Sequence, residues 1–226
     1  MNIVVIVQAR LGSRRLPHKI LLPIAGRPMI SYVLERCLKA SRPQSVILAT
    51  PFEDAKEISK RLDFEDDRLH IMGFSGDEND VASRFRNVLG VLAKRKIPDA
   101  FVRVCADSPL IDWVLMDWLI GQYQGGLLCN FQPRTWPPGQ CMEIMDSKAF
   151  MRQGDRGFDD SDREHVTQWY YRNCKFTNVA NPLGDFSGTN MCVDTPADFE
   201  RIKAVIEKMD RHHTLYGWQE LVEMMA

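Results

Sequence analysis

Strand-like and helix-like patterns alternate along the chain from Asn2 to Gln124. Runs rich in β-branched residues, typical of strands buried on both faces, occur at Asn2–Gln8, Ser45–Thr50, Leu69–Met72 and Ala100–Cys105. Helical spacing of apolar residues, or a polar helix-like pattern, occupies Met29–Leu38, Glu53–Leu62, Val81–Leu92 and Trp113–Gln124. Repeated βα units of this length need a parallel sheet with right-handed crossovers. The sequence therefore predicts an α/β fold, a three-layer α/β/α sandwich with a mostly parallel sheet.

The alternation stops near Leu127. From about 127 to 190 the chain is rich in aromatic residues, Pro, Gly and paired charges, without a long regular period. We expect a small inserted α+β region here, with short strands and a helix around His165–Arg172. Helical spacing returns after Pro196, and Trp218–Met225 is expected to form a last short helix. The prediction is one domain, 1–226, with an insertion at about 127–190.

Charge and cysteine content exclude several classes of protein. Lys plus Arg number 29 against 30 Asp plus Glu, a net charge of -1, whereas proteins that coat nucleic acid are strongly basic. The six cysteines show no C-x-x-C pair and no zinc-finger spacing with histidine, which favours core packing. There is no signal-peptide pattern at the N-terminus and no apolar run of about 20 residues, the length a spanning helix needs. We expect a soluble, cytoplasmic protein that neither binds nucleic acid nor inserts into a membrane.

The segment directly after the first strand is basic. Gln8–Lys19 contains four permanent cations and no acid: Arg10, Arg14, Arg15 and Lys19. In open α/β sheets, ligands bind at the carboxyl ends of the strands. Arg, Lys and the backbone N–H groups around Gly12 and Ser13 suit a polyphosphate. The segment predicts a triphosphate site, with a solvated basic loop as the alternative; neither G-x-x-x-x-G-K-[ST] nor G-x-G-x-x-G is present.

Two aspartates are candidate metal ligands. Asp107 follows the strand that ends at Cys105, and Ser108-Pro109 then turns the chain. Asp194 precedes Thr195-Pro196 and a helix, so its alternative role is a helix N-cap. Mg²⁺ prefers one or two carboxylates together with substrate phosphates. The pattern therefore indicates a magnesium site for a nucleotide.

Two further clusters contain residue types that can bind a metal. Asp160-Ser161-Asp162 has the D-x-D form of metal-dependent glycosyltransferases, but it lies in an irregular acidic stretch, where a solvated loop or a helix start is favoured. His212-His213 has no carboxylate or cysteine at a ligand spacing, which favours the surface.

Five motifs in order resemble the cytidylyltransferases that activate acidic sugars, the CMP-ketodeoxyoctulosonate and CMP-sialate synthetases, and especially their spore-coat polysaccharide branch. They span nearly the whole chain, in the forms QARLGSRRLPHKILLPIAGRPMI from Gln8, GDENDV from Gly76, CADSPLID from Cys105, DREHVT from Asp162 and VDTP from Val193. The resemblance implies a Mg²⁺-dependent enzyme that transfers CMP from CTP to a 2-keto sugar acid of surface polysaccharide and releases pyrophosphate.

The resemblance also implies roles for individual residues. Catalytic roles fall on Arg10, Lys19 and Asp107, and the metal ligands are Asp107 and Asp194. The nucleotide contacts are expected from Gln8, Ala9, Arg10, Leu11, Gly12, Ser13, Arg14, Arg15, Lys19 and Asp80. Acceptor-binding positions are Asn130, Glu143, Glu164 and His165. Which of Arg14 and Arg15 contacts phosphate stays open.

The insertion is expected on the acceptor side of the site or at a dimer interface, because members of the family are usually homodimers. Four positions depart from the family pattern. His18 stands where relatives carry glycine, Cys141 replaces an acid in the stretch from Trp136 to Glu143, and Arg103 and Cys105 differ from the strand end of the octulosonate enzymes. The identity of the acceptor is therefore left open.

Three rival functions remain. A nucleotidyltransferase for a sugar 1-phosphate or another base would begin with a G-G-x-G-x-R loop, which Ala9–Arg14 does not match. A non-catalytic nucleotide-sugar binder would have little need of both Asp107 and Asp194. A glycosyltransferase would bind metal through Asp160 instead of Asp107.

Overall fold

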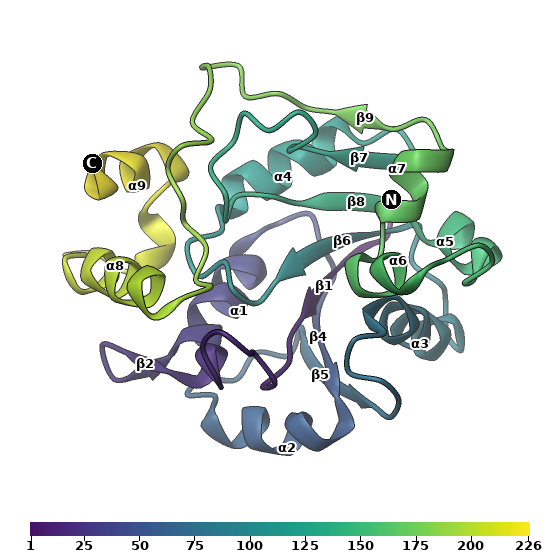
Figure 1. Cartoon of the computed structure of the whole chain (residues 1–226), viewed down its shortest axis with the longest axis horizontal. Helices are drawn as coiled ribbons and strands as arrows, with labels where there is room; N and C mark the ends of the chain where they lie inside the picture. Colours follow the sequence, from purple (N-terminus) through teal and green to yellow (C-terminus); the bar gives the residue numbers. More distant parts are fainter.

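The computed structural model describes residues 1–226 and contains one seven-stranded sheet in the order β5-β4-β1-β6-β8-β7-β9 (Figure 1). The strands are β1 (Ile3–Gln8), β4 (Ser45–Pro51), β5 (Leu69–Phe74), β6 (Ala100–Cys105), β7 (Leu127–Cys129), β8 (Glu143–Asp146) and β9 (Thr177–Asn178). Only β8 runs against its neighbours; the other pairings are parallel. The predicted three-layer α/β/α sandwich with a mostly parallel sheet is confirmed.

Strand β1 lies at the centre of the sheet and is buried on both faces. It pairs with β4 on one side and β6 on the other. Its side chains alternate between two cores: Ile3, Val5 and Val7 enter one, and Val4 and Ile6 enter the other. This alternation explains why the sequence shows an unbroken apolar run here.

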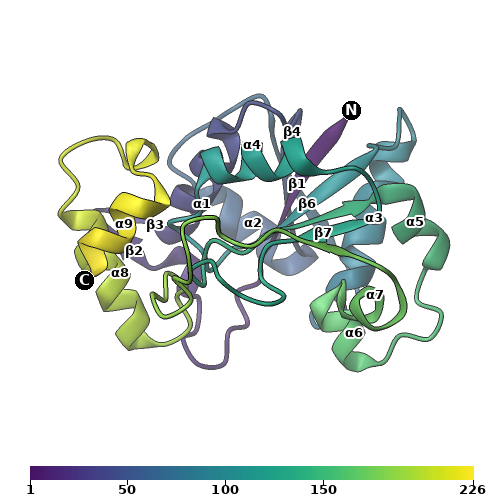
Figure 2. The same cartoon turned by 90° about the horizontal axis from the view of Figure 1, so that it is seen from above.

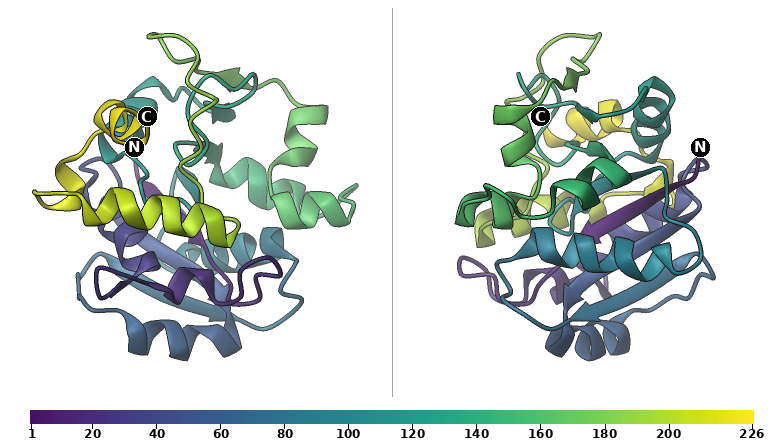
Figure 3. Two further views of the ribbon diagram at one scale, coloured as in Figure 1. Left: turned by 60° about the vertical axis from the view of Figure 1, so that its left-hand side comes forward. Right: turned by 90° about the vertical axis from the view of Figure 1, so that its right-hand side faces the viewer.

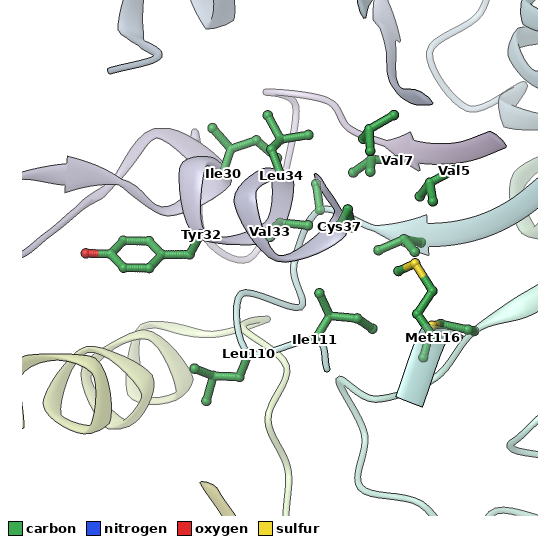
Figure 4. Packing of buried hydrophobic residues seen from close by; sticks show 14 of the residues in the cluster. Val5, Val7, Ile30, Tyr32, Val33, Leu34, Cys37, Leu110, Ile111 and Met116 are labelled. Atoms are coloured by element: carbon green, nitrogen blue, oxygen red, sulfur yellow. The ribbon is translucent and has the colours of Figure 1, made fainter. Parts of the chain in front are cut away.

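The larger core lies between the sheet and the helices α1 (Met29–Lys39), α4 (Trp113–Gln122), α8 (Pro196–Glu207) and α9 (Trp218–Met225). Ile30, Val33, Leu34 and Cys37 of α1 face the core together with Val5 and Val7, among other residues (Figure 4). Figure 2 shows α4 across the top of this layer and α8 with α9 at one end. Helix α2 (Phe52–Arg61) packs against β4 and β5 and buries Ile58.

The opposite face of the sheet is covered by α3 (Val81–Ala93), α5 (Ser147–Gln153) and α7 (Gln168–Asn173). Phe101 of β6 packs edge-on against Phe85 of α3 and Phe150 of α5. The two panels of Figure 3 bring α8 forward in one view and α3 with α5–α7 forward in the other. The two helix sets therefore cover opposite faces of the sheet.

The strands of the inserted stretch extend the central sheet. β8 pairs with β6, β7 with β8, and β9 with β7. The helix predicted around His165–Arg172 is α7, which begins at Gln168. A separate helix, α6 (Asp160–His165), precedes it, and Val166 between the two has φ 63°, in the left-handed region. The patterns also missed α5, the 3₁₀ turn η1 (Lys19–Leu21) and the hairpin of β2 (Pro23–Ile24) and β3 (Arg27–Pro28).

The cysteines are all free and only partly follow the core-packing prediction. Cys37 and Cys129 are buried, three others are half-buried, and Cys174 is exposed, contrary to the prediction. None of the helices combines the length and the apolar character that crossing a membrane requires.

Candidate active site

A cleft of about 570 Å³ opens at the carboxyl ends of β1 and β6. Its lining comes from the loop after β1, the loop before α3, the start of α3, the end of β6, the end of α6 and Asp194. Parallel strands place their ligand sites at this edge of the sheet. Twelve of the sixteen residues singled out from the sequence line it: Gln8, Ala9, Arg10, Gly12, Ser13, Arg14, Arg15, Lys19, Asp107, Glu164, His165 and Asp194.

The loop after β1 is held in shape by Leu11. Its side chain is buried, its N–H donates to Asp54 at 2.8 Å, and its carbonyl accepts from Ser13 and His18. Gly12 lies directly against the loop before α3, where a Cβ atom would come within 2.5 Å of the Glu78 carboxylate. Leu11 therefore supports the loop from beneath and does not line the cleft.

Lys19 is bonded to three acceptors of the protein. Its Nζ donates to the Val193 carbonyl at 2.7 Å, to Asp194 at 3.0 Å and to Asp107 at 3.2 Å. Burial on its own would lower the pKa of Lys19, but the Asp107 and Asp194 carboxylates raise it above its ordinary value. The ammonium is therefore charged and holds the two carboxylates together.

Asp107 and Asp194 come from distant elements and meet at this one ammonium. Asp107 follows β6, and the chain before Asp194 is fixed by the Val193 N–H, which donates to the Asp107 carbonyl at 2.9 Å. The N-cap alternative for Asp194 is wrong, because Thr195 is the N-cap of α8, in a capping box with Asp198. Two half-exposed carboxylates that converge beside a cationic loop fit the oxygen ligands Mg²⁺ prefers.

The other cations of the loop differ in how they are paired. Arg15 reaches Asp194 at 3.0 Å, whereas Arg14 is exposed and forms no ion pair. Arg10 donates to Asn79 at 2.6 Å and to Glu164 of α6 at 3.1 Å. Arg10 thus ties the loop after β1 to the loop before α3 and to α6, and Arg14 is the cation most available to a ligand.

A charged network around Glu143 lies behind the cleft on the insertion side, and of its members only Arg103 lines the cleft. This residue is 2 % exposed and accepts from Arg103, Thr167 and Tyr171, the last at 2.6 Å. Burial and the Glu143 charge both raise the pKa of Tyr171, so its hydroxyl stays protonated and donates. Burial opposes the charge of Arg103, but Glu143 more than offsets it and the pKa of Arg103 is raised.

Three predicted site residues besides Leu11 lie outside the lining of the cleft. Glu143 lies behind Arg103, and Asn130 is fully buried, bonded to the Gln140 carbonyl and the Met142 N–H. Asp80 is the N-cap of α3 and accepts from Ser83. The side chains of Asn130 and Asp80 therefore satisfy backbone groups and stabilise the fold, whereas Glu143 holds Arg103.

The D-x-D stretch forms a helix start, as favoured from the sequence. Asp159 caps α6, and the Asp162 side chain is fully buried and paired with Arg172 at 2.6 Å. None of Asp159, Asp160 and Asp162 lines the cleft.

The patterns missed several cleft residues, including Glu78, Asn79, Arg84 and Arg103. Arg84 is 4 % exposed; burial, followed by the nearby Arg10, lowers its pKa. Arg84 lies in the first turn of α3, and its Nη1 donates to the Glu78 carbonyl of the preceding loop. The available signal was an arginine within a run of regularly spaced apolar residues: Arg84 in α3 and Arg103 in β6.

The surface position predicted for the histidine pair is wrong for His213. It is 5 % exposed and bonded to Glu35 of α1 at 2.6 Å, and Arg27 holds the same carboxylate. The partner is 178 residues away in the chain, so local spacing could not reveal it.

A family model described as Cytidylyltransferase matches residues 4–216. The chain belongs to the cytidylyltransferase family. The Bacillus subtilis spore coat polysaccharide biosynthesis protein SpsF is 25% identical over 217 residues, 92% of this chain and 87% of that protein. A Haemophilus influenzae 3-deoxy-manno-octulosonate cytidylyltransferase is 35% identical over 118 residues, 51% of this chain and 43% of that enzyme.

Among solved structures, a cytidylyltransferase from Leptospira borgpetersenii has a TM-score of 0.86 at 25% identity, covering 100% of this chain and 94% of that one. The resemblance to acidic-sugar cytidylyltransferases and their spore-coat branch is confirmed. As a member of this cytidylyltransferase family, the protein is an enzyme, a nucleotidyltransferase.

Proposed function

We propose that this cytidylyltransferase transfers CMP from CTP to a 2-keto sugar acid of surface polysaccharide, with Mg²⁺ and with release of pyrophosphate. The observation that carries the proposal is the meeting of Asp107 and Asp194 at the Lys19 ammonium. Their carboxylates lie in the cleft whose wall carries Arg10, Arg14 and Arg15. Carboxylates beside a cationic loop are the complement of a metal-bound triphosphate.

The residues of the loop would bind and orient the triphosphate. Arg14 and Arg15 would neutralise its charge, and Lys19 would hold Asp107 and Asp194 in place until the metal-bound nucleotide arrives. Magnesium held by the two aspartates would neutralise the charge that gathers on the α-phosphate and the departing pyrophosphate. Preorganised charge of this kind, with positioning of the attacking acceptor hydroxyl, would supply most of the rate.

The names of the relatives support the acceptor class. The Haemophilus influenzae relative is named for 3-deoxy-manno-octulosonate, a 2-keto sugar acid, and the Bacillus subtilis relative for spore coat polysaccharide. The octulosonate relative matches about half of this chain. The exact sugar acid is therefore the open part of the proposal.

Pyrophosphate release tests the reaction. We expect release with CTP, Mg²⁺ and a 2-keto sugar acid, and none without the acid. Lys148→Ala, on the exposed start of α5 and outside the cleft, serves as a control with wild-type turnover. Release with a sugar 1-phosphate but not with the sugar acid, or with another nucleotide but not with CTP, would refute the proposed reaction.

The homodimer implied by the resemblance is also part of this proposal. Sedimentation velocity measures it directly: we expect a species of twice the 26.0 kDa chain mass at micromolar concentration. A single 26.0 kDa species would refute it.

A further inference from the structure

Arg103 occupies an unusual place for a charged side chain. It lies on the central strand β6, on the same face as Phe101, which packs in the smaller core. One step further along that face, the apolar packing ends and the cleft begins, because Arg103 and Cys105 line the cleft. Arg103 therefore lies at the boundary between the core and the floor of the cleft.

The guanidinium of Arg103 is fixed by two side chains from neighbouring strands. Nε donates to Gln8 of β1 at 2.8 Å, and Nη1 donates to Glu143 of β8. Glu143 is itself held by Thr167 and Tyr171, which come from the insertion. Such support locks the position of a group before any ligand binds, as a specific binding site requires.

The remaining nitrogen, Nη2, has no acceptor in the protein. It is not among the buried atoms that lack a partner, so it retains exposed surface, and Arg103 lines the cleft. Arg36 provides a contrast: it is fully buried, and both of its Nη atoms donate to carbonyls, those of Ile111, His213 and Tyr216. Arg36 is a structural arginine, whereas Arg103 keeps one donor group free.

We propose that Arg103 is a specificity-determining residue that binds the carboxylate of the acceptor through Nη2, an inference that rests on the proposed function. Nη2 offers two N–H donors, and a carboxylate accepts such bonds in the plane of the guanidinium. Gln8 and Glu143 are then the positioning residues that aim it.

The charges favour a carboxylate on the acceptor over the nucleotide as the ligand of Arg103. The exposed cations lie on the loop after β1, where a triphosphate of high charge would bind. Arg103 is already paired with the Glu143 carboxylate, so the pair is neutral as a whole. A neutral, fixed donor pair suits a ligand of single charge, and Arg103 is paired in the sheet with Glu143, the first residue of β8.

The test measures steady-state pyrophosphate release with CTP and Mg²⁺. The acceptor probes are 3-deoxy-manno-octulosonate, N-acetylneuraminate, their neutral C1 methyl esters, and glucose 1-phosphate. The variants are Arg103→Lys, which keeps the charge but loses the planar fork, and the double variant Arg103→Gln/Glu143→Gln. The double variant leaves no unpaired buried charge, so it keeps the test valid where Arg103→Gln alone fails to fold.

We expect the KM for the sugar acid to rise about 10- to 100-fold in both variants, the loss of one charge-assisted hydrogen bond, while the KM for CTP is unchanged. The preference for the acid over its methyl ester should fall by the same factor. Arg68→Gln is the matched control, because Arg68 also donates to two acceptors, the Leu38 and Ala40 carbonyls, but lies outside the cleft.

The other outcomes separate this inference from the proposed function. An active wild type whose variants keep the acceptor KM, keep the preference for acid over ester, or raise both KM values equally would overturn the role of Arg103 alone. Activity with glucose 1-phosphate and with no sugar acid would overturn the proposed reaction, and with it the carboxylate as the ligand of Arg103. A wild type that releases no pyrophosphate with any probe would overturn the proposed function and this inference with it.

Discussion

The two sides of the cleft are built in different ways. The loop side, formed by Gln8–Lys19 with Asp107 and Asp194, presents half-exposed charges that pair across short distances. The insertion side, formed by Arg103, Glu143, Thr167 and Tyr171, is a network in which the central carboxylate is 2 % exposed. Exposed charges can exchange partners when a ligand binds, whereas a buried network keeps its geometry.

The difference suggests a division of tasks. Under the proposed function, the loop side binds a highly charged triphosphate and can rearrange its ion pairs to do so. The insertion side is preorganised and would recognise the acceptor through a fixed donor. Substitutions on the loop side should therefore change nucleotide binding and turnover, and those on the insertion side should change stability or acceptor recognition.

Asp107→Asn should give the largest effect, a loss of turnover of at least about 10³-fold, because a metal ligand and a partner of Lys19 are removed together. The fold should remain, since the side chain is half-exposed and the amide is isosteric. Pyrophosphate release and thermal unfolding measure the two quantities. Turnover like that of the wild type would show that Asp107 holds no metal.

Glu143→Ala should lower the free energy of unfolding by about 3–5 kcal/mol, because Arg103 loses its ionic partner in a buried site. Urea denaturation measures the change. The matched control is Glu57→Ala on α2, whose ion pair with Arg61 is exposed and should be worth less than about 1 kcal/mol. Equal losses in the two variants would show that the buried network around Glu143 stabilises the fold no more than an exposed ion pair does.

Lys19→Ala should raise the dissociation constant for CTP by about 10- to 100-fold in the absence of Mg²⁺, because Asp107 and Asp194 then face the triphosphate without their shared cation. Added Mg²⁺ should recover part of the loss, since it replaces that positive charge. Calorimetric titration measures both conditions. An unchanged affinity for CTP in Lys19→Ala would mean that the loop after β1 is only a basic surface and not a nucleotide site.

Arg14→Gln should weaken CTP binding about fivefold, and Arg15→Gln by less, because Arg14 has no ion pair to give up and Arg15 must leave Asp194. The difference between the two variants should shrink as salt is raised, because both side chains are exposed. A larger effect at Arg15 would mean that its pairing with Asp194 survives in the complex and positions the nucleotide.

The loop side was largely predictable from the sequence, because its signals are local. A buried apolar strand, a run of cations after it and an aspartate after a second strand put Arg10, Lys19 and Asp107 at one edge of a parallel sheet. The same reasoning located the four parallel strands and their helices. The sequence left two roles open for Asp194, helix N-cap or metal ligand, because it does not reveal that Thr195 is the residue that caps α8.

The insertion side could not be predicted in this way, because its contacts join distant residues. Gln8 and Arg103 are 95 positions apart, and Arg103 and Glu143 are 40 apart. A resemblance could indicate Glu143 and Asn130. Only the fold reveals that Arg103 separates Glu143 from the cleft and that Asn130 is bonded to backbone groups of the core. The break between α6 and α7 at Val166 has no glycine to signal it.

The most direct test of the account is thermal unfolding with CTP, ATP, GTP and UTP, each with and without Mg²⁺. A ligand at 100 times its dissociation constant adds about 2.7 kcal/mol of stability, which is readily measured. We predict a Mg²⁺-dependent rise in Tm with CTP that the other three nucleotides do not produce and that Asp107→Asn abolishes. Equal shifts with all four nucleotides, or no shift with any, would contradict it.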